Sequence, residues 1–460
     1  MTTFVQPRRQ LLLAAAAVVL AGCGGGGDGT GSGPSIAEFS ADRPGYFVGD
    51  SAQLRIRYAG GAGRVDPGIG SVGADATVGT GALERSTSFR LTVTGNGGSA
   101  TREVTLPVTY RDRHRQVAEL QVAEHAAAAL DDGTVLVIGG SRGELNTPSR
   151  WIERLDPRAG TVTRVGELAA GRQQGEITAL GDGRWLLTGG SLAERIAGHT
   201  TEIIAIGAGG ELRVSGTGDM THPRIGHTGT LLADGRVLVT GGFSSGEGSP
   251  AGISRSAEIW EPASGRFRLL AARMSTARAD HTATRLPDGK VLIVGGYSVE
   301  ASPPLAEIFD PATETFAPLA TPGLASRAAH AAVALAGGDV LILGGENPAG
   351  TVALDSVLRF RYDTRTVQPL PGLLAPRRHA AAVATADGEV LLFGGAGLDD
   401  APSATAERYS PARGASAIAA MPAGRLEHSA VLLRGPQAGK VLLVGGWRGD
   451  WYNAAVSLYE

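Results

Sequence analysis

One short apolar segment recurs through most of the chain and constrains its fold more than any other feature. Residues 288–296 read DGKVLIVGG, and close copies stand at 132–140, 182–190, 234–242, 337–345, 387–395 and 439–446. The first glycines of the closing pairs lie 49 to 54 residues apart, at Gly139, Gly189, Gly241, Gly295, Gly344, Gly394 and Gly445. A period of about 50 residues with this content is typical of a propeller array, in which each repeat supplies one four-stranded blade.

Each repeat is predicted to fold as four antiparallel strands. In the repeat around DGKVLIVGG, strand A lies near 281–284, strand B at 291–296, strand C near 306–309 and strand D at 315–319. Asp-Gly between strands A and B is a favoured hairpin turn, because a type I′ turn needs positive φ at both central residues. The apolar runs of strand B are unbroken, as expected for strands that neighbouring blades cover on both faces.

The doubled glycines and the strand C segments together resemble the kelch repeat family. These segments read ERLDP at 153–157, EIWEP at 258–262 and EIFDP at 307–311. The resemblance implies a kelch-like β-propeller over residues 111–460. Strand D departs from the family, since its usual tryptophan is replaced by residues such as Val162, Phe267 and Phe316.

The two ends of the repeat region indicate how the ring closes. The seventh repeat supplies strands A, B and C and stops at Glu460, while residues 116–120 (QVAEL) resemble the end of the first strand D, 164–168 (RVGEL). We therefore predict that the N-terminal strand completes the last of seven blades. Closure of this kind removes the free sheet edge.

The first 33 residues resemble the export signal of a bacterial lipoprotein. Arg8 and Arg9 precede the apolar run 11–21, which is too short to span a bilayer, and residues 20–23 read LAGC. The resemblance implies a signal peptide at 1–23 and acylation of Cys23, which anchors the chain to a membrane. Residues 24–33 form a Gly-rich tether, and Gly24 after the cysteine favours the outer membrane of a Gram-negative cell envelope.

Residues 34–110 alternate apolar and polar side chains in short runs, at 36–39, 52–58, 88–93 and 102–108. Such alternation, interrupted by turn residues, predicts a small β-sandwich. The stretch resembles immunoglobulin-like modules, although the Cys-Trp-Cys core of antibody domains is missing. We expect it to serve as a spacer, with adhesion by the module as the alternative.

Composition excludes several classes of function. The net charge is −3, with no basic excess to hold a nucleic acid. The single cysteine permits neither an internal disulfide nor a cysteine metal cluster. The G-x-S-x-G match at 242–246 ends a blade strand instead of forming a nucleophile elbow. We predict no catalytic residue, metal or cofactor, and a monomer.

A recurring arginine precedes strand A in six repeats. The six residues are Arg172, Arg224, Arg278, Arg327, Arg377 and Arg425, and in four of them a histidine follows three residues later. One interpretation pairs these arginines with the glutamates that begin strand C: Glu153, Glu202, Glu258, Glu307 and Glu407. The other places guanidinium groups such as those of Arg224, Arg278 and Arg327 at one channel mouth, where they bind an acidic sugar or carboxylate.

The last B–C loop is the least repeat-like and holds two of the five tryptophans. We select Trp447, Arg448, Asp450, Trp451 and Tyr452 as candidate ligand contacts, because aromatic faces beside charges suit sugar stacking or a protein hot spot. The alternative is that these rings cover the blade closure. The favoured function is a lipid-anchored, extracytoplasmic scaffold that binds a protein or glycan. The second hypothesis is a carbohydrate-active isomerase or lyase acting on an acidic sugar.

Overall fold

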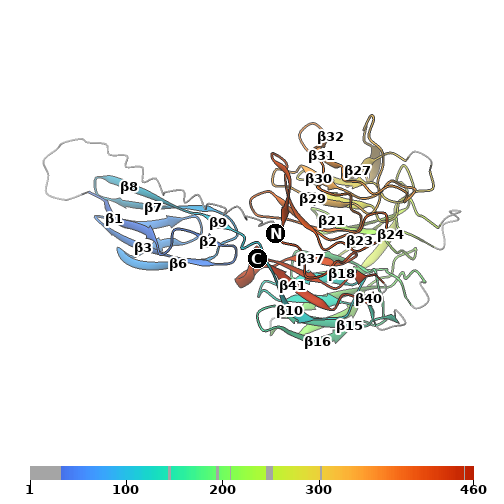
Figure 1. The fold of residues 1–460 in the computed structure, drawn as a ribbon, viewed down its shortest axis with the longest axis horizontal. Helices are drawn as coiled ribbons and strands as arrows, with labels where there is room; N and C mark the ends of the chain where they lie inside the picture. The colour runs from blue at the N-terminus through green and yellow to red at the C-terminus, as the bar shows by residue number, and fades with distance from the viewer. Residues whose placement is uncertain are drawn as a thin grey trace, which may run out of the picture. The chain divides into compact units, whose positions relative to one another are not determined.

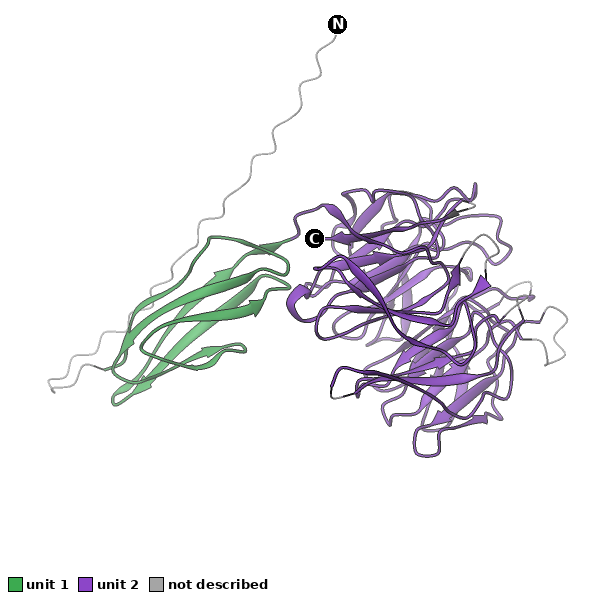
Figure 2. Cartoon of the chain, turned by 90° about the horizontal axis from the view of Figure 1, so that it is seen from below, with its two compact units in different colours: residues 1–109 green, residues 110–460 purple. Residues whose placement is uncertain are grey.

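The computed structural model describes residues 33–142, 147–192, 196–207, 209–244, 252–300, 303–449 and 451–460. Cys23 and nearly all of the predicted tether lie outside the described residues. The chain divides into unit 1, which ends at Thr109, and unit 2, which spans Tyr110–Glu460 (Figures 1 and 2). The described part of the chain contains no helix of the length and apolarity that crossing a membrane requires.

Unit 1 consists of two antiparallel sheets and one short parallel pair. One sheet has the order β1 (Ser35–Ala41), β3 (Ser51–Ala59), β6 (Asp75–Ala82). The other has the order β5 (Gly70–Val72), β4 (Ala62–Asp66), β7 (Thr87–Gly95), β8 (Gly98–Leu106). The parallel pair joins β2 (Tyr46–Phe47) to β9 (Val108–Thr109).

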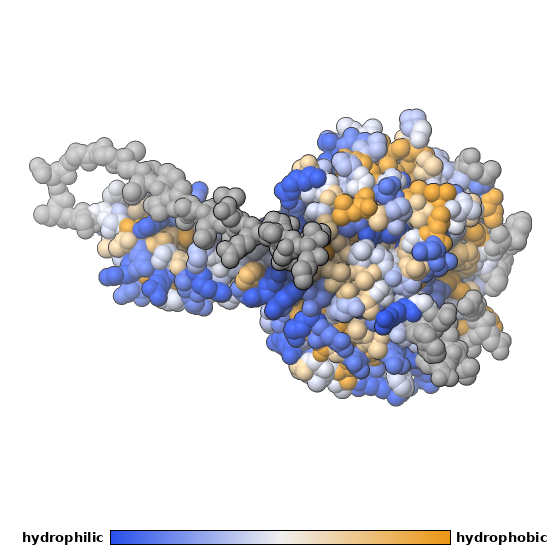
Figure 3. Space-filling model, viewed as in Figure 1, coloured by the Kyte–Doolittle hydropathy of each residue, from blue (hydrophilic) through white to orange (hydrophobic). Residues whose placement is uncertain are grey.

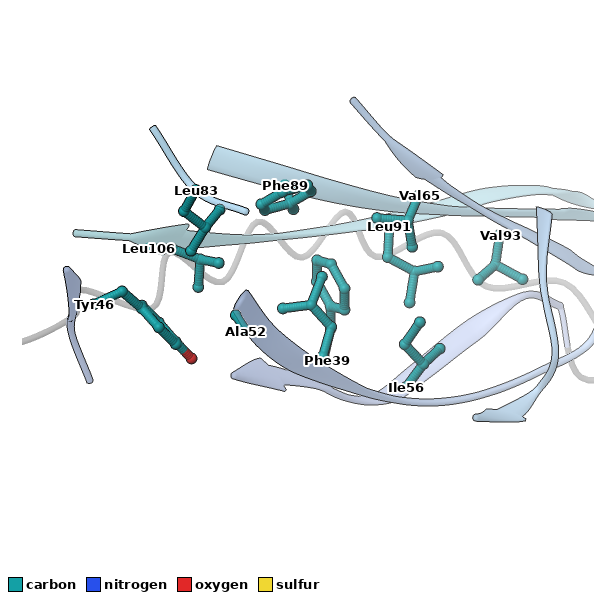
Figure 4. Close-up of a cluster of buried hydrophobic side chains, with 11 residues drawn as sticks. Phe39, Tyr46, Ala52, Ile56, Val65, Leu83, Phe89, Leu91, Val93 and Leu106 are labelled. Carbon is teal, nitrogen blue, oxygen red and sulfur yellow. The ribbon is translucent and has the colours of Figure 1, made fainter. Parts of the chain in front are cut away.

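The two sheets of unit 1 enclose one hydrophobic core. Phe39 and Ile56 project from one sheet toward Phe89 and Leu91 of the other (Figure 4). Strands β1, β3, β7 and β8 fall where the alternation predicts strands. The sequence analysis missed β4, β5 and β6, because segments such as 75–82 (DATVGTGA) consist largely of glycine, alanine and threonine and carry little apolar signal.

Unit 2 is an all-β propeller. Its described residues form seven four-stranded antiparallel sheets, which we number as blades 1 to 7, each with strands in the order A to D. Blades 1 to 3 are β11 (Ala126–Ala129), β12 (Val135–Ile138), β15 (Trp151–Asp156), β16 (Thr161–Glu167); β17 (Glu176–Ala179), β18 (Arg184–Thr188), β19 (Thr201–Ile206), β20 (Leu212–Gly216); and β21 (Thr228–Leu231), β22 (Val237–Thr240), β23 (Ala257–Glu261), β24 (Arg266–Leu269).

The remaining blades follow the same plan. Blades 4 to 6 are β25 (Thr282–Arg285), β26 (Val291–Val294), β27 (Ala306–Asp310), β28 (Thr315–Pro318); β29 (Ala331–Ala334), β30 (Val340–Leu343), β31 (Val357–Arg361), β32 (Thr366–Leu370); and β33 (Ala381–Ala384), β34 (Val390–Phe393), β35 (Ala406–Ser410), β36 (Gly414–Ile418). Blade 7 contains β37 (Ser429–Leu432), β38 (Val441–Val444), β41 (Ala455–Tyr459) and β10 (His114–Glu119).

Blade 7 joins the two ends of unit 2. Strand β10 pairs antiparallel with β41, so the N-terminal strand completes the last blade as the sequence predicts. The backbone N–H of Gly446 in blade 7 also donates to the carbonyl oxygen of Val122 in blade 1, at 3.0 Å. The first strands of successive blades are neighbours around the whole circuit, and β37 lies beside β11. The ring is therefore closed.

The glycine pairs make the close approach of adjacent blades possible. Gly295 and Gly296 have φ values of 64° and 96°, which side chains with a Cβ rarely adopt. A Cβ on Gly295 would lie 2.0 Å from the carbonyl oxygen of Arg327 and 2.8 Å from the ring of His330, both in the next blade. A Cβ on Gly296 would lie 2.9 Å from the Cβ of His281 in its own blade. In this pair, the first glycine therefore leaves space for the next blade, and the second leaves space for the histidine of its own blade.

Replacing Gly295 with alanine should destabilise unit 2 more than replacing Gly323, whose φ of 75° is also positive but whose Cβ would meet no atom within 4 Å. Both variants share a conformational cost of about 1–2 kcal/mol, and only Gly295→Ala adds the clash with Arg327, for a total of roughly 3 kcal/mol or more. Urea unfolding of the two variants measures the difference. Equal losses would show that the close approach is unimportant.

Candidate functional site

The recurring arginines are buried and bind the strand ends of their own blades. The side chain of Arg278 is fully buried, and its Nη1 donates to the carbonyl oxygen of Gly295 at 2.6 Å. Arg224 makes the same contact with Gly241 at 2.7 Å. The carbonyl oxygen of Arg278 in turn accepts from the N–H of Gly242 in the preceding blade at 2.8 Å. Each such arginine thus contacts the glycine pair of its own blade through its side chain and that of the preceding blade through its backbone.

Most of these arginines pair with the glutamate that begins strand C. The pairs are Arg172–Glu202 at 2.8 Å, Arg224–Glu258 and Arg278–Glu307 at 3.0 Å each, and Arg377–Glu407. In blades 5 and 7 the corresponding strand C positions hold Leu358 and Ser457. Burial there lowers the pKa of Arg327 and Arg425 to about 10. In blade 1, where Val122 replaces the arginine, Glu153 pairs with Arg142.

This geometry corrects one of the two sequence interpretations. Arg224, Arg278 and Arg327 are at most 4% exposed, and their donors are directed to glutamate, serine and backbone oxygens within the blade. A guanidinium group that is buried and hydrogen-bonded in this way is not available to an acidic ligand. These three residues therefore do not form a cationic mouth, and internal pairing describes them.

The recurring histidines are internal as well. His227, His281 and His330 each place Nε2 within hydrogen-bond distance of a threonine hydroxyl in the preceding blade: Thr188 at 2.8 Å, Thr240 at 2.9 Å and Thr282 at 2.9 Å. His125 follows Val122 in blade 1, so the arginine-based motif missed it. Burial lowers the pKa of His227 and His330 from 6.5 to about 3, and these rings are therefore neutral at pH 7.

The buried histidines should make the propeller sensitive to acid. A lowered folded pKa contributes stability that is complete above pH 6.5 and is lost as the pH falls toward 3, at about 1.4 kcal/mol per pH unit for each histidine. Glu176 and Asp280 act oppositely, because burial raises their pKa values to about 7 and 6 and their protonation stabilises the fold. Urea unfolding at pH 7.5, 6 and 5 should show a shallower decline for His227→Gln than for the wild type. Identical declines would contradict a buried neutral ring.

The residue just before each histidine position lies in a ring around the propeller axis. We call these residues the axial ring: Glu124, Gln174, Gly226, Asp280, Ala329, His379 and Glu427. All have φ between 50° and 63°. Their backbones are linked across blades, as in the N–H of Gln174 donating to the Glu124 carbonyl oxygen at 2.7 Å and that of Asp280 to Gly226 at 2.8 Å. Left-handed residues other than glycine persist only where surrounding structure fixes them, and they cluster at functional sites.

The axial ring differs from the rest of the repeat in that its side chains vary, and three of the seven residues are acidic. The amide of Gln174 donates to Glu124 Oε1 at 3.0 Å, and His379 Nδ1 lies 3.7 Å from Glu427 Oε1. Burial, with the negative charge of Glu427 as a further cause, raises the pKa of Asp280 to about 6. The sequence analysis missed this ring, although the variable third position of the R-x-x-H motif was its visible signal.

A second non-repeating cluster adjoins the axial ring. Tyr297 donates its hydroxyl to Glu346, and Arg378 Nη1 donates to the other oxygen of Glu346 at 2.9 Å. Arg378 also pairs with Asp400. Burial and the neighbouring Glu346 raise the pKa of Tyr297, which therefore stays protonated at neutral pH. Among the described residues, no group of three or more His, Cys, Asp or Glu side chains is placed to hold a metal ion.

The B–C loops expose apolar side chains at the same end of the blades as the axial ring. Backbone bridges such as Ala279–Tyr297 and Arg378–Ala396 hold the end of strand B beside the start of strand A. We call the exposed large side chains of these loops the apolar rim: Ile196, Phe243, Val299, Val352 and Leu398, which are 36% to 57% exposed. Hydrophobic residues also reach the surface of unit 2 in Figure 3. These side chains stand in equivalent loops of successive blades, which makes this face a candidate interaction surface.

The last B–C loop forms a small hairpin from β39 (Trp447–Arg448) and β40 (Trp451–Tyr452). The rings of Trp447 and Tyr452 stack with centroids 4.7 Å apart, and Arg448 is exposed. Asp450 and the side chain of Trp451 lie outside the described residues. Of the five residues selected in this loop, the structure therefore brings Trp447 and Tyr452 together.

Comparison with known proteins identifies one of the repeats. The family model described as "Kelch motif" matches residues 124–169, which include blade 1. The chain contains a kelch motif. No curated protein matches the chain. Solved structures do match, and one titled "Structure of YjhT" is 14% identical, covers 64% of this chain and 95% of that chain, and has a TM-score of 0.48.

Proposed function

We propose that this protein is a binding scaffold that recognises a protein partner through the B–C loop face of its propeller. The apolar rim is the observation that carries the proposal, because five exposed large side chains occupy equivalent loops of blades 2 to 6. The recurring arginine, glutamate and histidine side chains are buried and make contacts within and between the blades. Recognition therefore depends on the side chains that differ between repeats. A glycan is the alternative ligand, because aromatic rings such as those of Trp447 and Tyr452 suit stacking against a sugar.

The proposal includes an anchored, extracytoplasmic location in the cell envelope. Its support is the sequence alone: two arginines, an apolar run and LAGC at 20–23 precede a glycine-rich stretch. A lipid on Cys23 would hold the chain at the membrane. Unit 1, as an immunoglobulin-like module, would then act as the spacer that carries the propeller.

Replacing Cys23 with serine should release the protein from the membrane fraction, because the acylated thiol is the proposed attachment. The measurement is cell fractionation followed by mass spectrometry of the mature N-terminus. Wild-type protein should carry a diacylglycerol-modified Cys23. Equal membrane association of the Cys23→Ser variant, or an unmodified N-terminus in the wild type, would contradict the anchor.

A photo-crosslinking amino acid at Val352 should capture a partner protein in the producing cell. The same group at Asp234, in the A–B turn at the other end of a blade, is the matched control and should capture none. The double variant Val299→Ser, Leu398→Ser should reduce the adduct at position 352, because it removes apolar contact area and leaves the blades unchanged. Equal labelling at both positions would argue against the loop face.

A carbohydrate-active enzyme is the second candidate, and one observation favours it. Tyr297, Glu346 and Arg378 form a hydrogen-bonded cluster that is not repeated among the described residues of the other blades, beside the axial carboxylate of Asp280. Such a constellation could supply acid and base groups to an acidic sugar. The two candidates depend on different residues. Partner binding by a scaffold requires the apolar rim, whereas the activity of an enzyme would require Glu346 and would not change on substitution of Val299 and Leu398.

A further inference from the structure

We propose that the partner of this face presents a basic segment, in which a lysine or arginine side chain reaches the axial ring and flanking apolar side chains rest on the apolar rim. This inference rests on the proposed scaffold function and specifies the chemistry of its partner. The occupant is a protein segment, because a cation and apolar groups must be presented together at a fixed spacing.

The axial ring holds more acidic than basic side chains. Glu124, Asp280 and Glu427 supply three carboxylates from three blades. The described axial ring contains one basic side chain, His379, whose Nδ1 lies 3.7 Å from Glu427. The side chain of Asp280 lies against the backbone of the preceding blade, since a Cβ on Gly226 would lie 2.3 Å from Asp280 Oδ1. The charge of Glu427 acts on Asp280 from a non-adjacent blade. Glu427 and Asp280 therefore repel each other, and a cation bound near them would relieve that repulsion.

The charges next to the axial ring do not reverse this sign. Arg378 is paired with both Glu346 and Asp400. Arg142 is paired with Glu153. Glu176, in the first strand of blade 2, adds a further carboxyl, which accepts a backbone N–H from Gly229 at 3.4 Å. The centre of the loop face is thus acidic, and its basic groups are already paired.

Acidic residues also accompany the apolar rim. Val299 is followed by Glu300, and Leu398 by Asp399 and Asp400, all exposed. Exposed arginines on this face include Arg255, before β23, and Arg273, in the loop between β24 and β25. An exposed arginine, Arg448, belongs to the hairpin of blade 7. Acidic side chains thus stand beside the apolar rim in blades 4 and 6 as well as in the axial ring.

Charge complementarity selects the partner. A negative centre attracts a cationic segment and repels an acidic peptide, an anionic lipid or a nucleic acid. A lysine or arginine suits the geometry, because its long aliphatic stem can cross apolar surface while the charged end reaches carboxylates. The apolar rim then supplies the contact area that the charge pair alone lacks.

The test is selection of random twelve-residue peptides on the full-length protein, followed by affinity measurement with one enriched peptide. We expect enrichment of lysine or arginine flanked by apolar residues. The double variant Asp280→Asn, Glu427→Gln should weaken binding of that peptide about tenfold or more, because it removes two charges at nearly constant shape. Binding should also weaken when NaCl is raised from about 0.05 to about 0.5 M, since salt screens the attraction.

Two control variants separate the possible outcomes. Glu211→Gln removes an exposed carboxylate in the C–D turn at the other end of blade 2 and should leave affinity unchanged. Val299→Ser, Leu398→Ser should weaken binding whatever the charge of the peptide. Two outcomes would overturn the basic partner and leave the scaffold proposal standing, provided that binding depends on Val299 and Leu398. In the first the enriched peptides are acidic, and in the second their binding is insensitive to the Asp280–Glu427 variant. Peptides insensitive to Val299 and Leu398 would overturn both proposals. Thermal unfolding confirms that each variant is folded.

Discussion

The propeller depends on a contact made at every corner between adjacent blades. The second glycine of each pair donates its N–H to a carbonyl oxygen in the next blade. At six of the seven corners that oxygen belongs to the arginine whose side chain binds the first glycine of its own blade. Because both glycines lack a Cβ, backbone, guanidinium and imidazole groups fit within one corner. Val122 accepts the last of these bonds from Gly446, so the ring closes through the backbone even where the arginine is missing.

This arrangement divides the repeat into structural and variable positions. Arginine, glutamate and histidine recur because each closes a corner, and burial makes them inaccessible to a ligand. The axial ring residue, directly before the histidine position, differs between blades instead. Cross-blade backbone hydrogen bonds fix its left-handed conformation, and these bonds do not involve its side chain. Glu124, Asp280 and His379 occupy this position in different blades. In this protein, therefore, recurrence marks the framework and variation marks the surface available for recognition.

Electrostatics separates the inside of the ring from its centre. Inside the blades, four of the six recurring arginines pair with glutamates, and histidines stay neutral because burial disfavours the imidazolium ion. Around the axis, carboxylates outnumber basic side chains, and burial together with the charge of Glu427 raises the pKa of Asp280. The surrounding apolar rim adds contact area to this charged centre. Both features belong to the loop face, which is why we place recognition there.

The sequence by itself determined the repeat, the strands of each blade and the closing strand, because doubled glycines, Asp-Gly turns and unbroken apolar runs are local signals. It left open whether the arginines of the R-x-x-H motif line a mouth or pair with glutamates, since the two arrangements have the same spacing. It also gave little sign of β4 to β6 in unit 1, whose side chains are small. Only the tertiary structure decided that Arg278 is buried against Glu307 and that Glu124, Asp280 and Glu427 converge, because residues up to 303 positions apart meet only when the ring is closed.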